Sequence, residues 1–197
     1  MTRPRPKRDT NTAYNSIGRA AKDSTDVWAT PKHVLKWARE RFGDFSLDAA
    51  ASEWNSAAPE WIDEEADGLK TPWITDGVVW CNPPYGKLAR KFVQRAWEQV
   101  QKGNCKKVVM LLACRTDTLM FQEDIFPNAS NVHFIGGRLK FGDETNTANF
   151  ASVIVVFDAD HDVKKGAQFS FGRTGRSTKK RGKAKSNDQA SFGGIFE

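Results

Sequence analysis

A strand-like apolar run that stops at two consecutive prolines constrains the fold of this chain more than any other feature. Residues 78–81 are entirely apolar, and Asn82-Pro83-Pro84-Tyr85 follows them directly. Proline lacks the backbone N–H that a sheet ladder requires, so the strand must end there in a rigid loop. A helical pattern follows over residues 88–101, where apolar side chains recur on one face. This order of strand, loop and helix is typical of an α/β domain.

The same alternation of apolar runs and amphipathic stretches extends over most of the chain. Thr30-Pro31 is a typical helix start before an amphipathic stretch at residues 32–42. Residues 107–113 are apolar throughout their centre, as in parallel strands that are covered on both faces. The other predicted elements are strands at 45–48, 132–135 and 151–157 and a short helix at 119–126. We therefore predict an α/β fold with a mostly parallel central sheet, flanking helices and an antiparallel edge strand.

Charge is distributed unevenly along the chain. Residues 1–22 carry six basic residues and one acidic residue, residues 23–163 carry fifteen and twenty-one, and residues 164–197 carry nine and two. We predict a folded domain over residues 23–163 between a basic disordered arm and a basic flexible tail rich in Gly, Ser and Lys, because such ends cannot bury enough apolar surface to fold alone. Cationic arms suit a nucleic-acid partner, since they release counterions from phosphates. Arms that only solubilise the protein are the alternative.

Several classes of protein are excluded by the same composition. The sequence contains no apolar run of about 20 residues, so we expect no membrane span. No apolar stretch follows the basic first residues, which excludes a secretory signal and predicts a cytoplasmic location. Neither the cysteines nor the histidines have the spacing of metal ligands, so we predict no metal site and disfavour a metal-dependent nuclease. These residues are Cys81, Cys105 and Cys114, and His33, His133 and His161.

The proline-rich tetrapeptide has the chemistry to hold a planar amino group. The rigid loop points the Asn82 side-chain oxygen and the Pro83 carbonyl to one place, and two such acceptors suit an NH2 group. The exocyclic nitrogen of adenine is such a group, and directional acceptors stabilise the positive charge that develops as it attacks an electrophile. Tyr85 offers an aromatic face on which an extruded base could stack. A plain turn would explain Pro84 but not its combination with Asn82 and Tyr85.

The tetrapeptide matches the catalytic motif of amino-group methyltransferases, and the wider pattern resembles the phage-type Dam family of DNA N6-adenine methyltransferases. The further matches, in chain order, are residues 28–31, 47–52, 67–69 with Trp73, and 79–86. The resemblance covers about residues 25–158. It implies a Rossmann-like class I methyltransferase fold and the transfer of a methyl group from S-adenosylmethionine to a flipped adenine in double-stranded DNA. It also implies that the catalytic residues are Asn82, Pro83, Pro84 and Tyr85.

The resemblance further implies that the methyl donor lies across the ends of the first strands. The cofactor-binding residues that it implies are Trp28, Thr30, Pro31, Asp48, Ala49, Ala50, Asp67 and Asn82. Three of these have simpler interpretations: Asp48 as a helix cap, Asp67 as part of a solvated acidic loop, and Trp28 as a hydrophobic staple. The three consecutive alanines depart from the Gly-rich loop of most nucleotide-binding methyltransferases.

Contacts with DNA are expected from cations beyond strand ends and in the tail. These are Lys87, Arg115, Arg138, Lys140, Lys179, Lys180 and Arg181. Three segments could read the DNA sequence, at residues 51–73, 115–123 and 142–149. We expect a monomer or weak dimer encoded by a phage or prophage. Two other functions remain open: methylation of RNA or of a protein glutamine amide by the same tetrapeptide, and DNA binding without catalysis.

Overall fold

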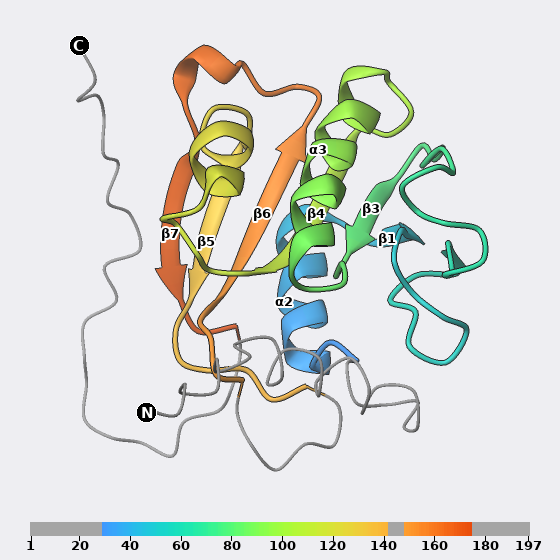
Figure 1. Ribbon diagram of the computed structural model, residues 1–197, viewed down its shortest axis with the longest axis horizontal. Coiled ribbons are helices and arrows are strands. Elements are labelled where there is room, and N and C mark those ends of the chain that lie inside the picture. The colour runs from blue at the N-terminus through green and yellow to red at the C-terminus, as the bar shows by residue number, and fades with distance from the viewer. Residues whose placement is uncertain (1–28, 142–147, 175–197) are drawn as a thin grey trace, which may run out of the picture.

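The computed structural model describes residues 29–141 and 148–174. Its central element is a seven-stranded sheet in the order β2-β1-β3-β4-β6-β5-β7 (Figure 1). The strands are β1 Phe45–Asp48, β2 Glu60–Trp61, β3 Val78–Cys81, β4 Lys107–Ala113, β5 Asn131–Ile135, β6 Ser152–Asp158 and β7 Gln168–Gly172. The helices are α2 Lys32–Phe42, α3 Lys87–Gln101, the π-helix η1 Met120–Ile125 and the 3-10 helix η2 Val163–Lys165.

The sheet is mostly parallel, as predicted. Strands β2, β1, β3 and β4 are mutually parallel. Strand β6 runs antiparallel to both of its neighbours, and β5 and β7 lie beyond it, parallel to each other. Figure 1 shows the arrows of β5 and β7 pointing to the lower edge of the sheet and that of β6 pointing away from it. The parallel strands therefore gather their following loops at one edge, where α/β folds bind ligands.

Helices cover both faces of the sheet. Figure 1 shows α3 and η1 in front of the sheet and α2 behind it. Alternate strand residues point to opposite faces: Val79 and Val108 join the core with α3 and η1, whereas Trp80 and Val109 join the core with α2. This double coverage explains why β4 is apolar throughout its centre.

Strand β7 corrects the predicted boundary at residue 163. The segment beginning at residue 164 was predicted to be a flexible tail, but β7 pairs with β5 along its whole length. Its Phe169 stacks on Phe134 and meets the ring of Phe126 edge-on, so apolar contacts hold this short strand despite the basic sequence around it. The sheet thus extends to Gly172.

Two further features differ from the sequence prediction. The predicted helix at 119–126 is a π-helix, in which the Phe126 N–H bonds the Phe121 carbonyl. The two-residue strand β2 pairs with β1 and was not predicted, because its exposed Glu60–Trp61 has no apolar pattern. None of the helices in the described part of the chain is long and apolar enough to cross a membrane.

Candidate active site

The tetrapeptide lies at the carboxyl edge of the sheet, between the end of β3 and the start of α3. Pro83 is buried and Pro84 is exposed. Gly86 then turns the chain into α3 with φ 86° and ψ −140°, a conformation that residues with a Cβ rarely adopt. The two prolines and this glycine fix the loop by backbone geometry.

Asn82 is held in place and keeps one buried acceptor available. Its Nδ2 donates to the Thr30 hydroxyl over 3.3 Å. Its Oδ1 is buried and has no hydrogen-bond partner among the described residues. A buried acceptor left without a donor costs about 1–3 kcal/mol, so such groups commonly mark ligand sites. The contact also joins the predicted amino-terminal cofactor motif to the predicted catalytic motif.

The ring of Tyr85 is positioned by two phenylalanines from the far half of the chain. Its centroid lies 4.9 Å from that of Phe150 and 6.3 Å from that of Phe141. These rings flank residues 142–147, which lie outside the described residues. No sequence pattern predicted that these two phenylalanines belong to the site, although they border residues 142–149, one of the segments predicted to read DNA.

Asp48 is a buried carboxylate that organises the loop after β1. It is only 3% exposed, and it accepts hydrogen bonds from the Ala57 N–H at 2.9 Å and the Ala50 N–H at 3.3 Å. Burial raises the pKa of Asp48 to about 6, and the two hydrogen bonds oppose that rise. The alternative prediction of a helix cap is wrong, because a turn follows β1 here and not a helix.

The motif at residues 67–69 packs directly on the motif at 48–50. A Cβ added at Gly68 would lie 2.4 Å from the Ala49 carbonyl oxygen, so only glycine allows this approach. Asp67 has φ 54° and accepts from the Leu69 N–H at 3.0 Å and from Lys70 Nζ at 2.8 Å. The Lys70 hydrogen bond is the main reason that the pKa of Asp67 is lowered. Asp67 is therefore charged and already paired.

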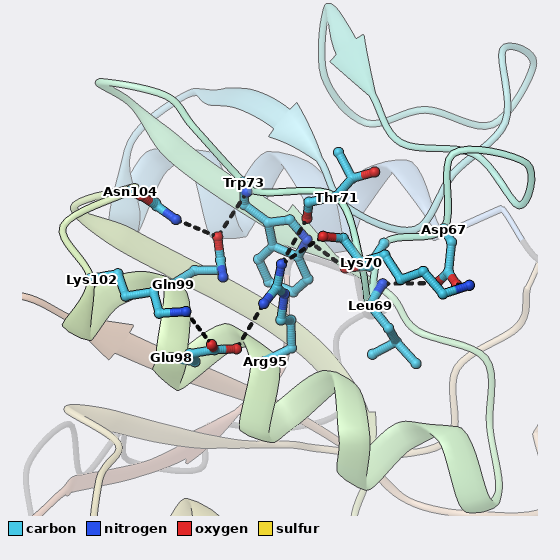
Figure 2. A network of polar contacts seen from close by, with 11 residues as sticks. Asp67, Leu69, Lys70, Thr71, Trp73, Arg95, Glu98, Gln99, Lys102 and Asn104 are labelled. Carbon is cyan, nitrogen blue, oxygen red and sulfur yellow. Dashed lines mark hydrogen bonds and ion pairs between the residues drawn. The ribbon is translucent and has the colours of Figure 1, made fainter.

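A polar network from α3 holds the segment that carries this second motif (Figure 2). Arg95 donates to the carbonyls of Lys70 and Thr71 at 3.0 and 3.2 Å. The Gln99 side-chain oxygen accepts from the Trp73 N–H at 2.9 Å, and the Trp73 indole donates to the Gly68 carbonyl at 2.8 Å. No sequence pattern singled out Arg95 or Gln99, because they meet this segment only in the tertiary fold.

On the β4 side of the tetrapeptide lies a pocket of about 560 Å³. It is lined by Pro83, Tyr85, Gly86, Lys87, Ala89, Arg90, Leu112, Ala113, Arg115, Asp117, Thr118, Leu119 and Met120. Lys87 and Arg115 are exposed there, and neither forms an ion pair with another described residue. Arg90, in contrast, is paired with Glu123 and Asp124. The structure thus brings two of the predicted DNA contacts together.

The other predicted site residues lie elsewhere or outside the described residues. Pro31 caps α2, and its carbonyl accepts the Val34 N–H at 2.8 Å. Arg138 and Lys140 precede Phe141 in the connection after β5, with Arg138 exposed and Lys140 half-buried. Outside the described residues are Trp28, Lys179, Lys180 and Arg181.

Comparison with known proteins identifies the family of this chain. Residues 18–184 match the family model described as DNA N-6-adenine-methyltransferase (Dam). The chain belongs to the Dam family. This match spans all the motifs assembled at the carboxyl edge of the sheet, and the predicted family resemblance is confirmed.

Two phage proteins illustrate the similarity to the Dam family. A DNA N-6-adenine-methyltransferase of Haemophilus phage HP1 (strain HP1c1) is 33% identical over 143 residues, which are 70% of this chain and 81% of the relative. A DNA N-6-adenine-methyltransferase of Escherichia phage T1 is 38% identical over 98 residues, 50% of this chain. The match spans only 40% of the length of the phage T1 relative.

A solved structure of a candidate RNA methyltransferase from Pyrococcus horikoshii is more distant. It is 12% identical, and the alignment covers 75% of this chain and 98% of that one with a TM-score of 0.44. This likeness adds nothing to the Dam assignment.

Proposed function

We propose that this protein is a site-specific DNA methyltransferase that transfers a methyl group from S-adenosylmethionine to the N6 amino group of adenine in double-stranded DNA. One observation carries the proposal: a buried Asn82 Oδ1 with no partner among the described residues, in a loop fixed by two prolines. Family membership and the two phage relatives support the same reaction.

The residues of this chain would act mainly by holding the amino group. Asn82 Oδ1 and the Pro83 carbonyl accept its two hydrogens, and the Thr30 hydroxyl keeps the Asn82 amide in orientation. These acceptors stabilise the positive charge that develops on nitrogen as it attacks, so no strong general base is needed. Tyr85 supplies the face on which the flipped base stacks. When bound, S-adenosylmethionine supplies an electrophilic methyl group on a sulfonium cation.

The β1 side of the tetrapeptide has the chemistry that the cationic donor requires. Residues 49–73 contain six acidic residues and one lysine, and the buried Asp48 lies at the start of this segment. Ala49 and Ala50 have small side chains beside it. We assign the donor to Thr30, Asp48, Ala49, Ala50 and Asn82, with Asp67 and Trp28 as further contacts. Asp67 would have to exchange its Lys70 partner for a ligand hydroxyl.

DNA would bind on the other side of the tetrapeptide and along the basic ends of the chain. Lys87 and Arg115 are exposed beside the pocket, and Arg138 and Lys140 lie in the connection leading to Phe141. Residues 1–22 and the part of the chain that follows β7 would add sequence-independent contacts to phosphates. We propose that the enzyme acts in the cytoplasm of a bacterial host, as a monomer or weak dimer, and without a metal ion.

A direct assay tests this function. The protein is incubated with S-adenosylmethionine and unmethylated duplex DNA, the DNA is digested to nucleosides, and N6-methyldeoxyadenosine is quantified by mass spectrometry. We expect the intact protein to form the product, and Asn82→Ala to form it at least about 100-fold more slowly. Donor binding without the product in DNA would contradict the proposal and direct the search to RNA or glutamine amides. If the donor does not bind either, a DNA-binding module without catalysis becomes the better description.

A further inference from the structure

The turn between β4 and η1 forms one wall of the pocket beside the tetrapeptide. Residues 115–120 line this wall except for Thr116, and Pro83 and Tyr85 line the side facing it. Figure 1 shows the connection from β4 to η1 running along the lower edge of the sheet, towards which β5 and β7 also point. A base that stacks on Tyr85 would therefore bring its neighbouring base pairs towards this turn.

The turn is built to hold its shape. The Thr118 N–H and hydroxyl both donate to the Arg115 carbonyl, at 3.1 and 2.8 Å. The Gln122 side chain donates to the Thr116 carbonyl at 2.7 Å. The following helix is tied to α3, because Arg90 bonds Asp124 and Glu123 at 2.6 Å each. Side chains on a fixed turn can discriminate between base edges, since little order has to be gained on binding.

Of the side chains that this turn exposes, Arg115 and Leu119 suit DNA, and the acidic Asp117 balances the charge of Arg115, so the turn has no net charge. The Arg115 guanidinium is exposed and has no ion-pair partner among the described residues. An arginine can bind guanine with two hydrogen bonds in the major groove, the commonest specific contact with a base. Leu119 is 58% exposed, although it is apolar. Proteins that distort a duplex often insert such an apolar side chain into the base stack.

The competing segment at residues 51–73 has the wrong charge for this task. It carries six acidic residues and one lysine, and Glu53, Glu60 and the acidic residues at 63–65 are exposed. Its exposed aromatic residues, Trp54 and Trp61, therefore lie on a surface that repels phosphates. The third predicted segment, 142–149, lies mostly outside the described residues. Among the described segments, charge favours the turn after β4.

We infer that residues 115–119 read the DNA sequence next to the target adenine. Arg115 contacts a base edge in a flanking pair, and Leu119 packs into the stack where the adenine has left it. This inference rests on the proposed function and names its specificity-determining residues.

The test measures site preference separately from activity. A duplex library with randomised bases on both sides of a fixed adenine is methylated, and modified molecules are sequenced. Arg115→Lys keeps the charge but loses the two-pronged geometry, so we expect the preference at one or more flanking positions to relax at least about fivefold. Lys106→Gln removes an exposed cation before the opposite end of β4 and should leave the preference unchanged. Thermal unfolding checks that both variants fold.

A second measurement is needed if Arg115→Lys methylates too little DNA for the modified molecules to be sequenced. The ratio of affinities for the preferred duplex and a scrambled duplex should fall for Arg115→Lys and for Leu119→Ala, but not for Lys106→Gln. Unchanged preference and an unchanged affinity ratio in both turn variants would overturn the inference while the enzyme still makes N6-methyladenine. An intact protein that makes no N6-methyladenine would instead overturn the proposed function, and the inference with it.

Discussion

The two sides of the tetrapeptide differ in charge and in openness. On the β1 side lie the buried Asp48 and the acidic segment 49–73, whose backbone packs closely where Gly68 meets Ala49. On the β4 side, an open pocket presents the exposed cations Lys87 and Arg115. One rigid loop thus separates surroundings suited to a cation from surroundings suited to a polyanion. Net charge alone, at +6, hides this division.

The two sides also differ in how they are built. Residues 49–77 contain only the two-residue strand β2, and their position depends on the network from α3 in Figure 2. The turn on the β4 side is short and stabilised by its own hydrogen bonds. A change in α3 at Arg95 or Gln99 should therefore disturb the proposed donor side more than the proposed DNA side.

The largest effect should come from the residue between the two sides. Asn82→Ala removes the acceptor that holds the amino group, and we expect kcat to fall about 10²- to 10³-fold, the usual cost of losing one preorganised polar group. Donor affinity should fall much less than kcat, because Asn82 is one of several residues that we assign to the donor. Single-turnover methylation and donor titration measure the two quantities. Thr30→Val removes the partner of Asn82 Nδ2 but leaves Asn82 Oδ1 in place, so it should have a smaller effect on kcat. Wild-type kcat in Asn82→Ala would refute the catalytic assignment.

Tyr85→Ala should have the next largest effect. Stacking on an aromatic ring is worth about 1–3 kcal/mol per base, so kcat/KM should fall roughly 5- to 150-fold. Tyr85→Phe should stay near wild type, because it keeps the ring that packs against Phe141 and Phe150. Steady-state kinetics on a duplex substrate compare the two variants. An equal loss in both would show that the hydroxyl, and not the ring, matters.

Truncation tests the contribution of the basic end to the DNA side. Removing residues 175–197 leaves β7 intact and takes away six Lys and Arg residues. We expect DNA affinity to fall about tenfold or more, and the slope of log K against log salt to decrease by up to about 5. A full-length chain with these six residues changed to Gln separates charge from length. If the slope does not move in either protein, the tail makes no phosphate contacts.

The smallest effect should be a pH dependence of the donor side. Burial raises the pKa of Asp48 to about 6, so its carboxylate is charged above that pH and neutral below it. Donor affinity should therefore weaken about fourfold between pH 7.5 and pH 5.5. Because the folded pKa exceeds the unfolded value of 3.8, ionisation of Asp48 lowers the stability of the folded protein as pH rises from about 4 to about 6, and the loss is complete above that range.

Titration calorimetry and urea unfolding at several pH values measure these two opposite trends. Asp48→Asn should flatten both of them. A donor affinity that keeps its pH dependence in Asp48→Asn would assign that dependence to another group.

The sequence was most informative where local pattern and tertiary role agree. The strands at 45–48, 78–81 and 107–113 match the structure. The runs at 78–81 and 107–113 are apolar and buried along most of their length, and Pro83-Pro84 ends the first of them. Strand β7 was missed because its alternating Phe169 and Phe171 lie within a basic stretch whose composition resembles a tail.

The sequence predicted the motifs of the candidate site but not the tertiary contacts that hold them. The loop after β3 and its Asn82 were visible in the sequence, because the prolines determine the local backbone. The contacts that Phe141, Phe150, Arg95 and Gln99 make with the site join segments tens of residues apart, and no local pattern encodes them. Phe141 and Phe150 reach Tyr85 from the connection between β5 and β6. The hydrogen bonds of Arg95 and Gln99 depend on how α3 is aligned with residues 67–73.

The central claim is that the methyl donor binds on one side of the tetrapeptide and DNA on the other. Its most direct test is to titrate one variant from each side with both ligands. Binding of S-adenosylmethionine and of duplex DNA is measured for the intact protein, Asp48→Asn and Arg115→Ala at pH 7.5. We expect Asp48→Asn to weaken donor binding and leave DNA affinity unchanged, and Arg115→Ala to weaken DNA binding and leave donor affinity unchanged. If either substitution weakens both ligands equally, or if the pattern is reversed, the tetrapeptide does not separate a donor side from a DNA side.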